Sequence, residues 1–286
     1  MFKIERFGNG EIIRWVWASN DTRMPRPLWT STYLVDGVLI DSGPPAGTDE
    51  LKEFITSLAS EQAIEKVIIT HWHEDHAGGA RLLTETLGLP VYIPKEGIDK
   101  VREGFSYPEY RVMAWGGPLE PAPAVQPLNF ILLATKSEKF SFKIIPCIGH
   151  SIDLIVLVEP TQQWCFISDS IQPVYQTIFG EPSEDIHEDM EQIYASLRNL
   201  QEITKGMDDL LIFTAGFGMF EGQKILIKNV SEIETLHKQV HELKTQGFSE
   251  RKIVKKVFGG EHLVGYVSNY ALSRLNLVRS LLKWSV

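Results

Sequence analysis

The 286-residue sequence has few cysteines, no long apolar run and no excess of positive charge, and each absence excludes a class of protein. Two cysteines, Cys147 and Cys165, cannot make a disulfide framework, so we expect buried thiols in a cytoplasmic protein. Residues 1–6 lack the apolar core of a secretory signal. No apolar run reaches the ~20 residues that span a bilayer, so we expect no membrane partner. The net charge of −9 makes nucleic acid an unfavourable partner, because phosphate binding generally needs a basic face.

The composition that remains is that of a globular protein, 43% hydrophobic and 23% charged. Short apolar runs alternate with amphipathic stretches, which predicts an α/β or α+β chain. Asp36-Gly37 between two apolar runs predicts a hairpin. We expect strands at 12–17, 32–35, 38–40, 64–69, 91–93, 140–146, 154–158, 164–168 and 210–213, and helices at 49–58, 78–87 and 185–200.

Residues 102–129 contain five prolines and little periodicity. A long irregular segment inside a domain is often a lid or a binding loop. Its aromatic residues either form an apolar wall for a substrate or pack the loop onto the domain. The residues concerned are Phe105, Tyr107, Tyr110 and Trp115.

The C-terminal part of the chain has a purely helical pattern. Ser231 and Glu234 form a capping box for a first helix, Ser249 opens a second, and residues 263–284 form a third. We therefore expect two domains, a catalytic domain at 1–228 and a small helical cap at 229–286. The cap either binds a partner, a homodimer mate included, or packs over the active-site mouth.

The strongest functional signal is the run Thr70-His71-Trp72-His73-Glu74-Asp75-His76, which directly follows the apolar segment 67–69. Imidazole and carboxylate are the ligands that borderline divalent metals prefer. So many ionisable groups in six residues repel one another unless a cation draws them together. His150 and Asp169 also follow predicted strands, so they are expected to join a site that suits one or two ions.

These motifs resemble the signature of the metallo-β-lactamase superfamily. The match rests on His71-x-His73-x-Asp75-His76 before Gly78-Gly79, with Asp41-Ser42-Gly43, Gly149-His150-Ser151 and Ser168-Asp169 in the same order as in the family. The resemblance implies an αββα sandwich of two mixed sheets. It also implies that His71, His73 and His150 bind one metal, Asp75 and His76 a second, and that Asp169 bridges the pair. Asp41 is expected to accept a ring N–H from a ligating histidine. The C-terminal helices resemble the helical or winged-helix appendage of some members.

One motif departs from the family pattern. Members usually carry a final histidine after the last core strand, and here that place reads Ala215-Gly216-Phe217-Gly218. Phe217 offers no metal ligand, so the second ion is expected to be labile, absent or held by another residue. The remaining histidines are His187, His237, His241 and His262, and each is an ordinary surface or helix histidine on the simpler interpretation.

The sequence therefore predicts a metal-dependent hydrolase of a small ester, thioester, lactone or related bond. Zinc is the expected metal, with iron or manganese as alternatives, and Asp75 orients the attacking water and carries its proton. The substrate-binding residues stay open, and the candidates are Tyr107, Tyr110, Trp115 and Phe217. Two other functions remain open: mononuclear-iron oxygen and sulfur chemistry of the persulfide-dioxygenase kind, and a non-catalytic binding protein on the same scaffold.

Overall fold

The computed structural model describes residues 2–23, 27–58, 61–183 and 186–285, which form two compact units. The chain passes between the units several times, so each unit contains three segments. Unit 1 is Met1–Pro146, Asp153–Ser168 and Phe213–Met219, and unit 2 is Cys147–Ile152, Asp169–Ile212 and Phe220–Val286. No helix among the described residues is both long enough and apolar enough to cross a membrane.

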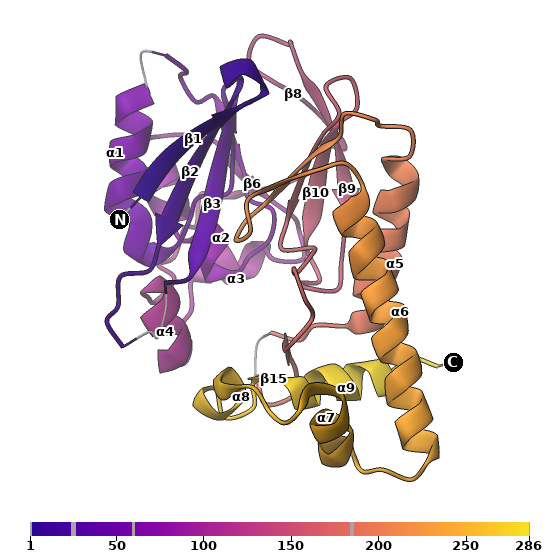
Figure 1. Cartoon of the computed structure of the whole chain (residues 1–286). Coiled ribbons are helices and arrows are strands. Elements are labelled where there is room, and N and C mark those ends of the chain that lie inside the picture. The colour runs from indigo at the N-terminus through magenta and orange to yellow at the C-terminus, as the bar shows by residue number, and fades with distance from the viewer. Residues whose placement is uncertain (1, 24–26, 59–60, 184–185, 286) are drawn as a thin grey trace. The chain divides into compact units, whose positions relative to one another are not determined.

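The first sheet of unit 1 has its seven strands in the order of the sequence (Figure 1). Neighbours are antiparallel from β1 to β4 and parallel from β4 to β7. The carboxyl ends of the parallel strands meet at one edge of the sheet, which brings the residues after β4 and β5 together. The strands are β1 Phe2–Phe7, β2 Ile12–Ala18, β3 Trp29–Val35, β4 Val38–Ile40, β5 Lys66–Ile68, β6 Val91–Ile93 and β7 Gln126–Pro127.

The second sheet has the order β14-β13-β11-β10-β9-β8, and its last two strands in the sequence extend past the boundary of unit 1. An aromatic cluster packs the two sheets of unit 1 together. The Tyr33 ring lies 5.2 Å from Phe166 and 5.5 Å from Phe213, and these two phenylalanines stack at 4.7 Å. The strands are β8 Leu132–Ala134, β9 Ser141–Pro146, β10 Ile155–Glu159, β11 Trp164–Ser168, β13 Leu211–Thr214 and β14 Met219–Glu221.

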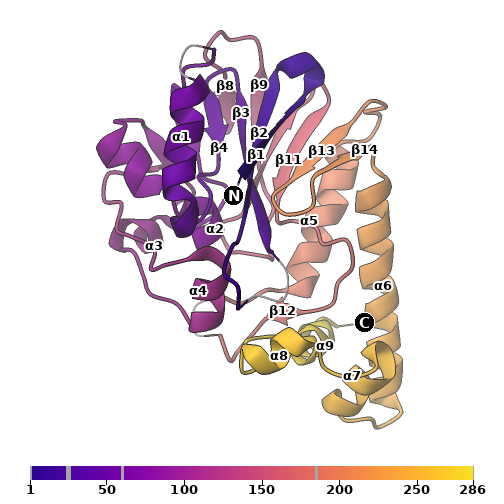
Figure 2. The same cartoon turned by 60° about the vertical axis from the view of Figure 1, so that its left-hand side comes forward.

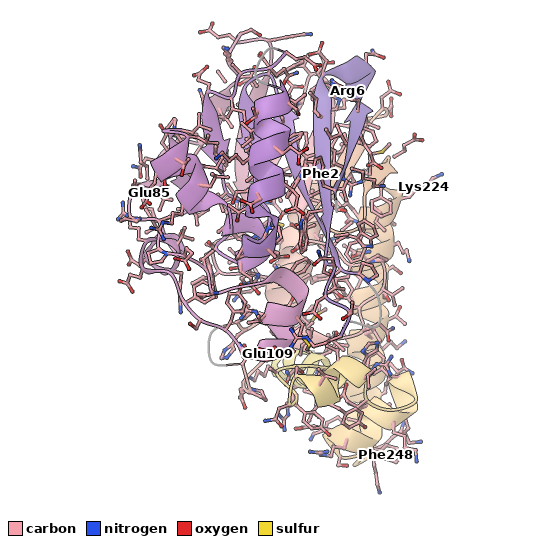
Figure 3. The ribbon with its side chains drawn as sticks, turned by 90° about the vertical axis from the view of Figure 1, so that its left-hand side faces the viewer. Phe2, Arg6, Glu85, Glu109, Lys224 and Phe248 are labelled. Carbon is pink, nitrogen blue, oxygen red and sulfur yellow. The ribbon has the colours of Figure 1, made fainter. Side chains whose placement is uncertain are left out.

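Helix α1, Thr48–Leu58, covers the other face of the first sheet (Figure 2). Its acidic first turn suits the helix dipole, and Leu51 and Phe54 are buried, with Phe54 6.2 Å from Trp15 of β2. Charged side chains such as Glu85 and Glu109 lie on the outside of unit 1 (Figure 3). The shorter helical elements of unit 1 are η1 Gly8–Gly10, η2 Pro45–Gly47, α2 Glu74–Ala77, η3 Leu82–Thr86, α3 Ile98–Glu103 and α4 Glu109–Trp115.

Unit 2 is helical, with one small sheet of β12 and β15. Helix α9 contacts α5, α6 and α7, so the C-terminal helices and α5 share one core. Asp189 caps α5 by accepting from the amides of Glu191 and Gln192, and Ser273 caps α9. The elements are β12 Ile178–Phe179, α5 Met190–Ile203, α6 Lys224–Thr245, α7 Glu250–Phe258, α8 Leu263–Val267, β15 Leu272–Ser273 and α9 Arg274–Lys283.

The C-terminal region differs from the prediction in its helix ends. Helix α6 already begins at Lys224, so Ser231 lies inside it and caps nothing, because Ile225 and Leu226 extend the buried face toward the N-terminus. The predicted 263–284 helix is broken into α8 and α9, and Asn269 and Tyr270 between them have positive φ. The expected boundary between 228 and 229 stays a prediction, although α6 runs through it.

Other local predictions need smaller corrections. In place of the predicted 78–87 helix, the short α2 already ends at Ala77, and a π-helical turn follows at Leu82–Thr86. The 185–200 helix begins at Met190, where Asp189 caps it, and residue 185 lies outside the described residues. Strands β1 and β8 were not predicted, and the proline-rich segment contains helix α4.

Candidate metal centre

The histidine run leaves the carboxyl end of β5 and turns into α2 within unit 1. His71, His73 and His76 are all buried. His71 Nε2 lies 3.1 Å from His73 Nδ1, and a ring nitrogen of His76 lies within 4.8 Å of one of His71. Gly78 is needed just beyond, because a Cβ there would lie 2.3 Å from the carbonyl carbon of Pro44. The fold therefore packs three imidazoles into one buried corner.

Asp41, directly after β4, holds this corner together. Its backbone is left-handed, with φ +64°, and its carboxylate is buried. One oxygen accepts from the Thr70 amide at 2.7 Å, and the other accepts from the Thr70 hydroxyl at 3.0 Å and from His76 Nδ1 at 2.9 Å. His76 consequently carries its proton on Nδ1 and directs Nε2 toward Asp75, whose nearer oxygen is 3.4 Å away.

The Thr70 hydroxyl extends the network to a second histidine. It lies 3.1 Å from His71 Nδ1 and 2.9 Å from the hydroxyl of Ser168. Because Thr70 donates to Asp41, its oxygen accepts from His71 Nδ1, which leaves His71 Nε2 with a lone pair. The roles of Thr70 and Ser168 were not predicted, although Thr70 directly precedes the first histidine.

Two further contacts fix the histidine loop in unit 1. Asp153 accepts from the Trp72 amide at 3.0 Å. Glu74, to which the sequence assigned no chemistry, makes a bidentate ion pair with Arg111 of α4, and both side chains are buried. Burial raises the pKa of the Glu74 carboxyl, and the guanidinium opposes that rise. This pair anchors α2 to the helix in the proline-rich segment.

Unit 2 carries the other two predicted ligands. His150 Nε2 lies 3.8 Å from an Asp169 oxygen, and His150 Nδ1 is 2.8 Å from Glu188. The second Glu188 oxygen accepts from the Phe179 amide at 2.7 Å. Glu188 thereby fixes the proton of His150 on Nδ1, a role that the sequence did not reveal, because 38 residues separate the two. Gly149 allows the loop to approach α5, since a Cβ would lie 2.4 Å from the Ile193 nitrogen.

Phe217, in place of the usual final histidine, is 49% exposed in the turn between β13 and β14. The four remaining histidines make local contacts in unit 2. His187 lies 2.7 Å from the Ser183 carbonyl, His237 and His241 contact the Trp284 carbonyl, and His262 caps α8. These contacts agree with their interpretation as ordinary histidines.

The predicted substrate residues of the proline-rich segment take part in packing within unit 1. The Tyr107 hydroxyl donates to the Gly116 carbonyl, and the Arg111 guanidinium lies over the Tyr107 ring at 5.0 Å. Trp115 lies 6.3 Å from Trp17. Substrate binding by Tyr107, Trp115 or Tyr110 stays a prediction.

Cys147 and Cys165 are both buried and form no disulfide, which confirms the prediction of buried thiols. Burial raises the pKa of the Cys147 thiol to about 11, so that side chain is protonated at neutral pH.

A family model of the metallo-beta-lactamase superfamily matches residues 26–213. The Beta-lactamase-like protein 2 homolog of Caenorhabditis elegans is 28% identical over 185 residues, 61% of this chain and 52% of that protein. The chain thus spans about half the length of this curated relative.

Two solved structures share the fold. A metallo-beta-lactamase from Pontibacter korlensis has a TM-score of 0.60 at 16% identity and covers 82% of this chain and 99% of its own. The mono-zinc form of FIM-1 from Pseudomonas aeruginosa has a TM-score of 0.57 at 14% identity and covers 82% and 95%. This likeness confirms the predicted αββα sandwich.

Proposed function

Because the chain belongs to the metallo-β-lactamase superfamily, we propose that it is a zinc-dependent hydrolase of a small ester, thioester, lactone or related bond. One observation carries the proposal. In His71, His76 and His150 alike, Nδ1 faces an oxygen acceptor of the protein's own, which leaves Nε2 with the lone pair that a metal needs. A histidine that served packing alone would have no need of this shared tautomer.

The donor set fits zinc in geometry as well as in chemistry. Two nitrogen ligands at ~2.0–2.1 Å from a tetrahedral zinc lie ~3.3 Å apart. His71 Nε2 and His73 Nδ1 are 3.1 Å apart, close to that edge length. Neutral imidazoles and carboxylates also bind iron and manganese. We propose zinc, although this ligand set would accept those two metals as well.

We assign the ligands as the family pattern implies. His71, His73 and His150 would hold the first ion, Asp75 and His76 would hold the second, and Asp169 would be shared by both sites. Phe217 adds nothing to the second set, so one firmly bound ion is expected. The mono-zinc form of FIM-1 supports a one-ion state on this fold.

Each residue of the site then has a separate role in the proposed hydrolysis. A bound zinc ion would lower the pKa of a coordinated water from ~15.7 toward ~7 and polarise the scissile carbonyl. Asp75 has its carboxylate on the Nε2 side of His76, so it accepts a proton from the attacking water and passes it to the leaving group. Asp41, Thr70 and Glu188 hold the imidazoles in the ligating tautomer.

An Asp75→Asn variant tests this assignment. The purified full chain is expected to contain zinc by elemental analysis and to hydrolyse p-nitrophenyl esters. The variant should keep the first ion and lose activity by about 10²–10⁴-fold, as expected for a general acid–base group. Glu85→Gln, an exposed carboxylate change, serves as the matched control. Unchanged activity in Asp75→Asn would remove the assigned role.

The metal count tests the role of Phe217. Phe217→His should raise the zinc content from one to two equivalents, because it restores an imidazole to the second set. Two equivalents in the unaltered chain would mean that another residue completes the site. Iron in place of zinc, with oxygen uptake on a persulfide, would favour the dioxygenase alternative.

A further inference from the structure

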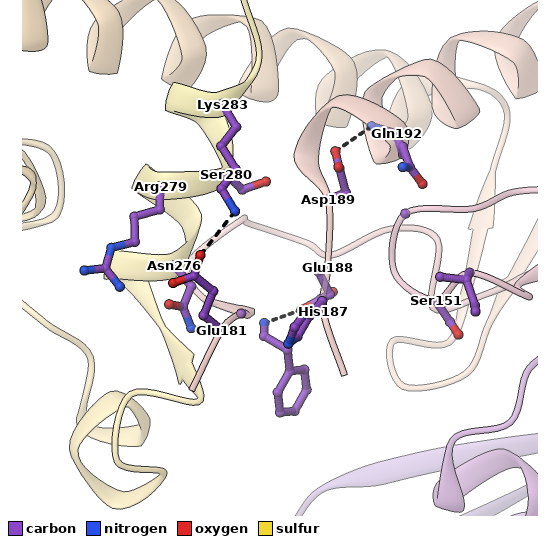
Figure 4. A pocket seen from close by; sticks show the side chains of 14 residues that line it. Ser151, Glu181, His187, Glu188, Asp189, Gln192, Asn276, Arg279, Ser280 and Lys283 are labelled. Atoms are coloured by element: carbon purple, nitrogen blue, oxygen red, sulfur yellow. Dashed lines mark hydrogen bonds and ion pairs between the residues drawn. The ribbon is translucent and has the colours of Figure 1, made fainter. Parts of the chain in front are cut away.

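Unit 2 contains a cavity of about 320 Å³ beside the loop that carries His150. Gly149 and Ser151, which flank that histidine, line it, and so does Glu188, which bonds its ring. Figure 4 shows Arg279, Ser280 and Lys283 on one helix, α9, with Glu188, Asp189 and Gln192 coming from another wall. The volume is within the range of sites for small organic ligands.

The acidic groups of this cavity are mostly engaged by the protein. Glu188 accepts with one oxygen from His150 and with the other from the Phe179 amide. Asp189 accepts from two amides at the start of α5. The buried amide of Asn276 donates to the carbonyls of Tyr270 and Ala271. Few strong acceptors or buried donors therefore remain for a ligand on this wall.

The donors on α9 are available. Arg279 uses Nε for Glu250 at 2.9 Å, and among the described residues its Nη1 and Nη2 make no hydrogen bond. Lys283, one turn further along the helix, has a single 3.6 Å ion pair with Glu181, in which both side chains are more than 70% exposed. Such an exposed pair is weak and exchanges readily for a ligand. Ser280 accepts from the Met190 amide, so its hydroxyl proton is free to be donated.

The α9 wall of the cavity offers cationic donors, while across the cavity both Glu188 oxygens are engaged and Asp189 already accepts from two amides, so the α9 wall is complementary to an anion. We infer that Arg279, Ser280 and Lys283 bind a carboxylate or phosphate group of the substrate, remote from the bond that is cleaved. The inference rests on the proposed hydrolase function, because it places the reacting bond at the His150 side of the cavity. It narrows the substrate class to small anionic esters or thioesters.

Paired substrates of equal length test the inference on the zinc-loaded full chain. Mono-p-nitrophenyl glutarate carries a distal carboxylate, and p-nitrophenyl valerate carries a methyl group in its place. We expect kcat/KM to favour the glutarate ester by about tenfold or more, the size of one charge-assisted hydrogen bond. The preference should fall to about twofold or less in Arg279→Met/Lys283→Met. It should persist in Arg198→Met/Lys205→Met, which removes the same charge from α5 and the residues that follow it.

Calorimetric binding separates this inference from the proposed function. Glutarate should bind more tightly than valerate, and 4-phosphonobutyrate in the same titration decides between a carboxylate and a phosphate-like group. If neither ester is hydrolysed but the binding preference depends on Arg279 and Lys283, the hydrolase proposal fails and the anion site stands. If both esters are hydrolysed equally, or the preference survives in the α9 variant, the anion site is refuted. Circular dichroism of both double variants checks that they fold.

Discussion

Replacing Asp41 with asparagine exchanges one carboxylate oxygen for an NH2 group beside the buried corner formed by His71, His73 and His76. Asparagine tolerates the left-handed backbone of this position, φ +64°, so the backbone contributes little to the effect. The carboxylate accepts three hydrogen bonds, from the Thr70 amide, the Thr70 hydroxyl and His76 Nδ1. An amide has one oxygen and one NH2 group, and it cannot satisfy this set in either orientation.

The two orientations of the asparagine amide have different consequences: one lowers metal affinity and the other lowers the stability of the fold. If the NH2 group faces Nδ1 of His76, the imidazole must move its proton to Nε2, which blocks metal ligation. Loss of such an orienting partner lowers metal affinity by about 10–100-fold, or ~1.4–2.7 kcal/mol. If the NH2 group faces the Thr70 amide, a buried N–H stays unpaired, which costs ~1–3 kcal/mol of stability.

Chelator competition for zinc and thermal unfolding of the metal-free chain measure the two costs separately. Asp36→Asn is the matched control, since Asp36 also has positive φ, +40°, and also accepts hydrogen bonds from side chains. We expect the control to leave zinc affinity unchanged. An Asp41→Asn variant that kept both its zinc affinity and its unfolding temperature would refute the tautomer argument.

Two further predictions concern buried acids. Glu188→Gln should lower zinc affinity by about tenfold in the same chelator assay, because one amide cannot accept from both His150 and the Phe179 amide; equal affinity would contradict the role of Glu188. Arg111→Met should cost ~3–5 kcal/mol in urea unfolding near pH 7, since it leaves Glu74 buried without its cation. Burial raises the pKa of the Glu74 carboxyl, so this group holds its proton to a higher pH in the folded state than in the unfolded state. The free energy of unfolding therefore falls as the pH rises from the unfolded pKa of Glu74 to its raised folded pKa. The stability lost in Arg111→Met should therefore shrink as the pH is lowered from neutrality, and a loss that grew would refute this sign.

Local features of the sequence predicted the elements around the site well. Asp36-Gly37 forms the hairpin between β3 and β4, and both residues have positive φ as such a turn requires. The apolar segment before His71 forms β5 and delivers the histidine run at its carboxyl end. These features depend only on residues that are neighbours in the sequence, so they can be predicted from hydrophobic periodicity and from the residue types that turns require.

Helix ends were predicted less well, because packing overrides local signals. A capping box at Ser231 is a sound local start, but burial of Ile225 and Leu226 extends α6 beyond it. The last helix is interrupted where β15 pairs with β12, more than 90 residues away in the sequence.

The sequence by itself determined the family, the αββα fold and the side chains proposed to bind a metal, because these follow from a short run of imidazoles and carboxylates after a strand. Only the tertiary structure decided which oxygen faces Nδ1 of His71, His76 and His150. Asp41 and Thr70 are 29 residues apart, Glu188 and His150 are 38 apart, and Arg111 and Glu74 are 37 apart. The partner of a buried polar group is the group that the fold places within ~3 Å of it, and that distance cannot be read from the order of residues in the sequence.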